Sequence, residues 1–159
     1  MYLIFLIYRK MIEIERKFLI HNLDFLKTIE CEKATISQGY LFEDQGKSLR
    51  VRVKNTEAFL TLKFGDEAIV REEFEVSISL LYGKCLLEKC AKVLEKDRYT
   101  VHIEDLSWEI DVFKGTLFGL CLAEVELKDP TQVIEIPPWV GEEVTQNPDY
   151  LNINLIKRL

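Results

Sequence analysis

The chain has 159 residues, of which 48% are hydrophobic and 30% are charged, and its formal net charge at pH 7 is -6. These values are typical of one folded domain with a substantial core, and they argue against an intrinsically disordered chain. The negative net charge argues against general binding to nucleic acids or to anionic membranes.

The cysteines do not form a soft-metal motif. Cys31, Cys85, Cys90 and Cys121 show no Cys-x-x-Cys spacing, and the chain has only two histidines. Zinc is therefore not expected, and reduced thiols in a cytoplasmic protein are the simplest interpretation.

An apolar run, Tyr2 to Tyr8, stands at the beginning of the chain. It is much shorter than the ~20 residues that a membrane-spanning helix needs. No basic region precedes it and no small-residue cleavage site follows it, so a signal peptide is not predicted. We expect Met11 to be the natural start and residues 1–10 to be an extension. The alternative is an additional strand, or a segment that packs on a neighbour.

Apolar and alternating runs predict eight strands, with short helices between some of them. The expected strands are 11–20, 36–43, 48–54, 58–64, 68–76, 95–103, 107–113 and 121–128. Helices are expected near 23–30 and 78–92, and a last helix is expected to begin at Asn147-Pro148, a capping residue followed by proline. The predicted fold is an α+β chain dominated by β structure. Residues 11–159 would form a single domain, an eight-stranded antiparallel β-barrel with helices packed outside.

The first predicted strand places Glu13, Glu15 and Lys17 at alternate positions. Alternate residues of a strand point to one face and lie ~6.5 Å apart. Two carboxylates at that distance repel each other unless a cation binds them. A divalent metal ion would suit the carboxylates, and the lysine would suit a phosphate oxygen.

Every other predicted strand except the second, 36–43, also carries charge on one face, and neighbouring charges mostly share a sign. The basic positions are Arg50, Arg52, Lys63, Arg71, Lys96 and Arg98, and the acidic positions are Glu73, Glu75, Glu109, Asp111, Glu124 and Glu126. A solvated sheet face is polar too, and this explanation suffices for any single strand. A solvated face normally mixes both signs, however, so segregated blocks favour separate metal and anion sites inside a charged barrel.

The stretch Ile12–Leu19 contains a Glu-x-Glu-x-Lys motif. Further motifs follow in order: Gln38–Leu41, Leu49–Arg52, Leu60–Lys63, Arg71–Glu75, Lys96–Tyr99, Trp108–Phe113 and Ala123–Glu126. In this order the motifs resemble those of the CYTH superfamily, also called triphosphate tunnel metalloenzymes, whose signature is ExExK. The resemblance covers about residues 11–155.

The resemblance implies a tunnel of eight antiparallel strands that binds a linear triphosphate with Mg²⁺ or Mn²⁺. The implied metal ligands are Glu13, Glu15, Asp111, Glu124 and Glu126. The implied triphosphate ligands are Lys17, Arg50, Arg52, Lys63, Arg71, Lys96 and Arg98. Supporting roles fall to Glu73, Glu75 and Glu109.

Hydrolysis needs a group that orients or deprotonates the attacking water. We hypothesise that Tyr40 and Lys63 form this pair, because Tyr40 shares the tunnel face of its strand. Crowding by arginines is expected to lower the pKa of Lys63. The alternative for Tyr40 is an ordinary half-buried sheet tyrosine.

The expected substrate is inorganic triphosphate, because Trp108 and Trp139 are both expected in the outer layer and no aromatic pocket is evident. The alternatives are a thiamine or nucleoside triphosphatase, a class IV adenylyl cyclase, and a polyphosphate-binding module without catalysis. The expected partner is thus a small-molecule triphosphate, and binding to a nucleic acid or to a membrane is not expected. Whether the chain forms a homodimer is left open, as is whether the helix after Asn147 plugs one tunnel mouth.

Overall fold

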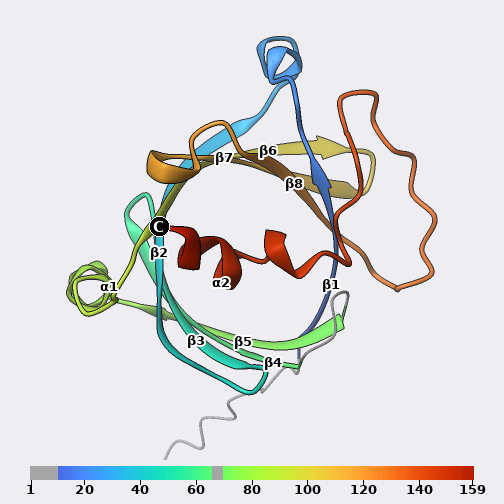
Figure 1. Ribbon diagram of the computed structural model, residues 1–159. Helices are drawn as coiled ribbons and strands as arrows, with labels where there is room; N and C mark the ends of the chain where they lie inside the picture. The colour runs from blue at the N-terminus through green and yellow to red at the C-terminus, as the bar shows by residue number, and fades with distance from the viewer. Residues whose placement is uncertain (1–10, 66–69) are drawn as a thin grey trace, which may run out of the picture.

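The computed structural model describes residues 11–65 and 70–159, in which eight antiparallel strands close into a barrel. The strands are β1 (Met11–Leu19), β2 (Glu32–Asp44), β3 (Lys47–Lys54), β4 (Glu57–Phe64), β5 (Val70–Ile78), β6 (Leu94–Ile103), β7 (Leu106–Phe113) and β8 (Cys121–Glu126). They are paired around the ring in the order β1-β5-β4-β3-β2-β6-β7-β8, with β8 returning to β1 (Figure 1). The predicted fold class is confirmed.

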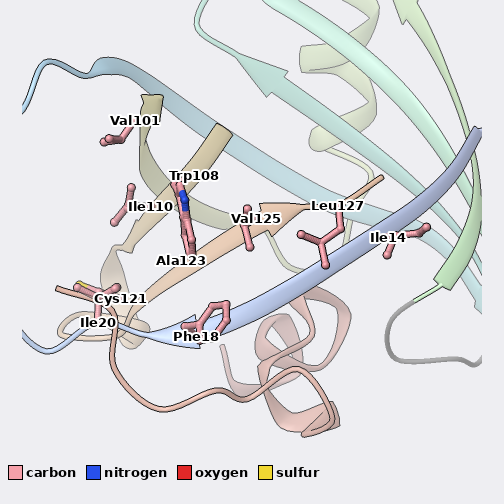
Figure 2. Packing of buried hydrophobic residues seen from close by; sticks show 10 residues of the cluster. All are labelled: Ile14, Phe18, Ile20, Val101, Trp108, Ile110, Cys121, Ala123, Val125 and Leu127. Atoms are coloured by element: carbon pink, nitrogen blue, oxygen red, sulfur yellow. The ribbon is translucent and has the colours of Figure 1, made fainter. Parts of the chain in front are cut away.

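Alternation along each strand separates an apolar outer face from a charged inner face. On β1, Ile14 and Phe18 are buried in the outer layer, whereas Glu15 and Lys17 line the interior. The outward faces of β1, β6, β7 and β8 form the larger apolar core, of which Figure 2 shows ten residues. Burying this surface is the main force that closes this side of the barrel.

Segments that follow β1 and β8 cover this core. The first contains the 3₁₀ helix η1 (Asp24–Lys27). The ring of Phe25 stacks on Trp139 with ring centres 4.3 Å apart, and Trp139 meets Trp108 edge to face at 5.5 Å. Both tryptophans therefore lie outside the barrel wall, as predicted.

The opposite side of the barrel is covered by α1 (Leu80–Leu87), which packs on β3 and β4. The hydroxyl of Ser79 caps the helix by accepting a hydrogen bond from the backbone N–H of Tyr82. A Cβ at Gly83 would lie 2.4 Å from the Cβ of Ala58. This glycine therefore allows α1 to lie directly on the strand.

Several predicted boundaries were wrong. Strand β2 begins at Glu32 rather than at 36, because its early residues pair with β6. The helix expected over 23–30 is only the 3₁₀ turn η1. Helix α1 ends at Leu87 rather than at 92. The chain turns after Leu87, so that Cys90 packs against Gly39.

Strand β5 extends to Ile78 rather than to 76 because its last residues pair with β4. The first two residues of its predicted range, 68 and 69, lie outside the described residues. So do residues 1–10, on which the expectation about the start of the chain depends. None of the helices in the described ranges is long and apolar enough to cross a membrane.

The chain ends in three short helices: η3 (Pro148–Tyr150), α2 (Asn152–Leu155) and η4 (Ile156–Arg158). Asn147 caps η3 as predicted, but Leu151 is extended and interrupts the expected single helix. Unlike α1, α2 does not lie outside the barrel: it crosses the middle of the ring (Figure 1).

Apolar residues fix this C-terminal segment to the barrel. Leu155 and Ile156 are buried against inward-facing side chains of β6, β7 and β8, namely Leu94, Phe113 and Leu122. We call this part of the tunnel the apolar end. A short 3₁₀ helix, η2 (Gly115–Leu117), lies between β7 and β8, and its Leu117 joins the same cluster.

Candidate active site in the charged tunnel

The barrel encloses a main cavity of about 400 Å³. Its basic lining residues are Lys17, Lys47, Arg50, Arg52, Lys63, Arg71 and Arg98, and its acidic ones include Glu13, Glu15, Glu73, Glu109, Glu124 and Glu126. Tyr40 from β2 and residues 151–154 from the C-terminal segment complete much of the wall. Both signs of charge therefore meet in one space, as the alternation predicted.

A second cavity of about 310 Å³ adjoins the first, sharing Glu13, Glu73 and Glu126 with it. Glu75 also lines this space. On β1, Glu13 is six positions from Leu19, which packs on the apolar end, so the two lie ~20 Å apart along the strand. The tunnel thus runs from an apolar end, through a basic middle, to an acidic end.

Arg98 is the centre of the densest charge network. Its Nε and Nη2 donate to the two carboxylate oxygens of Asp111 at 2.7 Å each, and Nη2 also donates to Glu124 at 2.9 Å. Nη1 donates to Glu109. Strand register places Arg98 directly opposite Asp111, which accounts for the bidentate geometry.

Lys96 and Asp111 lie behind the cavity wall rather than on it. The side chain of each is only 1% exposed, and neither lines the main cavity. Lys96 Nζ lies 2.5 Å from Asp111 Oδ2 and donates to Asn152 Oδ1 at 3.3 Å. Burial lowers the pKa of Lys96 to about 8, although Asp111 opposes this shift.

Lys17 is also buried, but it reaches the cavity. Its Nζ lies 2.8 Å from Glu124 Oε1 and 3.6 Å from Glu15 Oε1. Burial opposes the charge on Lys17, but these two carboxylates outweigh it and raise the pKa of the lysine. Burial also opposes ionisation of Glu124, yet Lys17 and Arg98 hold the pKa of that carboxyl well below its usual range. The two groups are therefore a stable ion pair.

The expectation of a lowered pKa at Lys63 was wrong. Its Nζ lies 2.5 Å from Glu13 Oε2 and 2.6 Å from Glu73 Oε2. Burial and Arg50 lower the pKa, but the nearby carboxylates outweigh them, so the pKa of Lys63 is raised. The ammonium is therefore a fixed positive charge rather than a base.

Tyr40 faces the main cavity opposite Arg50 in the β2–β3 register. Its ring packs against the apolar end. Burial raises the pKa of its hydroxyl, although Arg50 and Lys63 oppose the shift. The hydroxyl thus keeps its proton and is suited to donate a hydrogen bond.

A row of directly opposed residues on β3, β4 and β5 holds the arginines. The hydroxyl of Thr61 donates to Glu75 Oε2 at 2.7 Å and accepts from Arg50 Nη2 at 3.2 Å. Arg52 Nη2 donates to the same carboxylate oxygen at 2.8 Å. Arg50 lies 3.8 Å from that oxygen, so Thr61 bridges the two groups.

Replacing Thr61 by valine is expected to raise the KM for an anionic substrate about fivefold, because Arg50 would lose an orienting bond of about 1 kcal/mol. Steady-state kinetics at saturating metal would measure this change, and kcat should change less. Thr61→Ser keeps the hydroxyl and should restore KM. If serine and valine raise KM equally, the hydroxyl alone does not explain the effect, and the bridging role assigned to Thr61 is wrong.

Two arginines that line the main cavity each keep one buried donor without a partner among the described residues. The Nε groups of Arg50 and Arg52 are buried and have no hydrogen-bond partner within the described ranges. Buried donors of this kind are costly unless an acceptor satisfies them. The guanidinium groups of Arg50 and Arg52 line the main cavity, and such groups fit an anion with several oxygens, such as a phosphate chain.

Carboxylates at the acidic end fit a hard cation. Glu126 makes no ion pair with any residue that the structure describes, and burial together with the charges of Glu13 and Glu109 raises its pKa. Repulsion among these groups would be relieved by a divalent ion with oxygen ligands. Within the described residues, no three such side chains are already clustered closely enough to hold a metal.

A family model, described as CYTH domain, matches residues 11–159. The chain belongs to the CYTH family. It is 43% identical over 147 residues to the inorganic triphosphatase of Acetivibrio thermocellus, covering 91% of this chain and 93% of that protein. It is 37% identical over 147 residues to the inorganic triphosphatase of Nitrosomonas europaea, covering 89% and 95%.

A solved structure is also similar to this CYTH chain. It is the crystal structure of the inorganic triphosphatase NE1496, with a TM-score of 0.67 and 36% sequence identity. The match covers 91% of this chain and 93% of that one. The resemblance seen in the sequence motifs is confirmed.

Most of the candidate residues in this CYTH chain line the main cavity. Lys96, Asp111 and Glu75 do not: the first two lie behind Arg98, and Glu75 lines the second cavity. Sequence reasoning missed Thr61, which lies between two charged strands, and Asn152, which the C-terminal segment brings into the tunnel. Thr61 and Lys63 are alternate residues of β4 and therefore point to the same face, and this was the one feature of the sequence that could have indicated Thr61.

Proposed function

We propose that this chain hydrolyses inorganic triphosphate to diphosphate and phosphate inside the barrel, with the help of a divalent metal ion. The observation that carries the proposal is the cluster of lysines and arginines that line the main cavity, beside carboxylates that repel one another. No tryptophan or phenylalanine is among the described residues that line the main cavity. This lining supports a substrate without a base or ring. The two related inorganic triphosphatases support the same choice.

In this proposal Mg²⁺ or Mn²⁺ is held by oxygen ligands at the acidic end. The proposed ligands are Glu13, Glu15, Glu124 and Glu126. When bound, the ion would neutralise charge on the phosphates. Glu124 is paired with Lys17 and Arg98 but lines the main cavity. Asp111 lies behind the cavity wall with both oxygens bonded to Arg98 and Lys96, so we assign it the role of positioning Arg98.

Six cations of the main cavity would bind the phosphate oxygens. These are Lys17, Arg50, Arg52, Lys63, Arg71 and Arg98, supported by Glu73, Glu75 and Glu109. Phosphoryl transfer requires positioning and stabilisation of spreading negative charge, and fixed cations in a partly closed tunnel provide both. Lys96 would act through Asp111 and Asn152 rather than by direct contact.

The hydroxyl of Tyr40 would orient the attacking water or a phosphate oxygen by donating a hydrogen bond. Its raised pKa supports a donor rather than a base. With the pKa of Lys63 also raised, neither member of the pair predicted from sequence is suited to deprotonate water. Water activation then depends on charge and orientation.

Tyr40→Phe is expected to lower kcat at least about tenfold, because an oriented donor to a charged group is worth about 1.5–3 kcal/mol. Phosphate release at saturating triphosphate would measure it. Tyr82→Phe is a matched control, since Tyr82 is 67% exposed on α1. Retention of most of the wild-type turnover in Tyr40→Phe would remove this hydroxyl from the mechanism.

Incubation with triphosphate, ATP or thiamine triphosphate, in Mg²⁺ or Mn²⁺, tests the proposal. Rapid phosphate release from inorganic triphosphate supports it. Preference for ATP or thiamine triphosphate would favour those triphosphatases, and formation of cyclic AMP would indicate a cyclase. Binding without product would indicate a polyphosphate-binding module.

The four cysteines are all free thiols, which supports a reducing, cytoplasmic location.

A further inference from the structure

Helix α2 brings a polar side chain to the wall of the main cavity at the apolar end. Asn152 lines the cavity, and its side-chain oxygen accepts a hydrogen bond from Lys96 Nζ at 3.3 Å. Leu155 and Ile156, which follow in the same segment, are buried in the apolar cluster and hold this segment in place. The buried leucine and isoleucine thus hold the backbone of Asn152 in place, and Lys96 holds its side-chain oxygen.

The bond to Lys96 determines which way the amide of Asn152 faces. An ammonium group has only donors, so the oxygen of the amide, and not its nitrogen, must face Lys96. Lys96 is itself fixed by Asp111 at 2.5 Å. The Nδ2 group of Asn152 thus points away from Lys96, and it donates no hydrogen bond to any of the described residues.

The neighbouring asparagine has a different environment. Asn154 also lines the main cavity, but its Nδ2 donates to the backbone oxygen of Pro148 at 2.8 Å. Its Oδ1 accepts from Lys157 Nζ at 3.1 Å. Both ends of that amide are therefore engaged within the protein, whereas the Nδ2 group of Asn152 donates to none of the described residues.

We propose that Asn152 is a further triphosphate-binding residue, whose Nδ2 donates to a phosphate oxygen at the apolar end, with Lys96 as the residue that positions it. The inference rests on the proposed function. Phosphate oxygens are acceptors only, so an amide whose oxygen is already engaged presents the complementary group. A neutral donor adds a contact there without further cationic charge.

Asn152→Asp tests the proposal, because aspartate keeps the shape and the oxygen near Lys96 but replaces the N–H donors by a charged acceptor. The KM for inorganic triphosphate should rise at least about tenfold, with a smaller change in kcat. Calorimetric titration with inorganic triphosphate in Mg²⁺ should show the same loss of affinity. Asn152→Ala should show a smaller loss, since it removes the donor without adding repulsion.

Asn154→Asp is the matched control, with the same change of charge two residues away on the same wall. It should lower the melting temperature by removing the bond to Pro148, but raise KM much less than Asn152→Asp. Equal increases in KM for the two variants would overturn the assignment, because charge alone would then explain both. An Asn152→Asp protein that melts like wild type and keeps KM within twofold would also overturn it.

The two proposals can fail separately. If the wild-type protein binds triphosphate in calorimetry but does not hydrolyse it, the proposed hydrolysis fails. The comparison of the two aspartate variants by calorimetry then still decides the role of Asn152. If the wild-type protein does not bind triphosphate, both proposals are wrong.

Discussion

Replacing Glu13 by glutamine is expected to lower metal-dependent triphosphate hydrolysis by about a thousandfold while the barrel stays folded. Glu13 lines both cavities, at the acidic end where the proposed ion is held. Losing a carboxylate ligand would remove several kcal/mol of charge stabilisation, and each 1.36 kcal/mol corresponds to about tenfold in rate. Phosphate release as a function of Mg²⁺ or Mn²⁺ concentration would measure the effect.

Stability should change little in the same variant. The carboxylate of Glu13 pairs with Lys63 at 2.5 Å, but Lys63 also has Glu73 at 2.6 Å, so no buried charge is left alone. Glu57→Gln is a matched control, on the exposed first residue of β4 and outside both cavities. Glu15→Gln should behave like Glu13→Gln, and a fully active double variant would disprove the metal site.

The inner face of the barrel was predictable because strands alternate with a period of two residues. Glu13, Glu15 and Lys17 share one parity on β1, and all three line the main cavity. A shift of one residue would have moved all of them to the outer layer, so the apolar positions Ile14 and Phe18 fixed the register. The sign-sorted pairs on the other strands followed from the same rule.

The alternation of residues did not predict how deeply each inward-facing side chain is buried in the wall of the barrel. Lys96 and Arg98 share a parity, but only Arg98 reaches the main cavity, because the C-terminal segment packs over the tunnel beside Lys96. The pKa of Lys63 likewise depends on carboxylates from β1 and β5, which are distant in sequence. Parity gives the face of a side chain, whereas these properties depend on how strands and segments meet.

The C-terminal segment is the other feature that the sequence left open. Asn147 and Pro148 correctly indicated a helix start, but nothing local indicated the extended residue Leu151 that redirects the chain. Burial of Leu155 in the apolar end stabilises this path. The position of Asn152 in the tunnel therefore follows from tertiary packing rather than from helix propensity.

Arg98→Met is expected to destabilise the protein by about 3–5 kcal/mol, in addition to abolishing activity. The guanidinium pairs with Asp111, Glu109 and Glu124, and its removal leaves carboxylates that Lys96 and Lys17 only partly compensate. For a domain of this size the melting temperature should fall by about 10 °C. Calorimetric or circular dichroism melting would measure the loss.

Arg52→Met separates this structural role from substrate binding. Arg52 lines the same cavity but pairs with a single carboxylate, Glu75 at 2.8 Å, and its buried Nε has no partner in the described part of the chain. Its removal should weaken triphosphate binding while costing much less stability than Arg98→Met. If both variants melt at the temperature of the wild type, the network around Arg98 contributes little to the fold and both arginines serve binding alone.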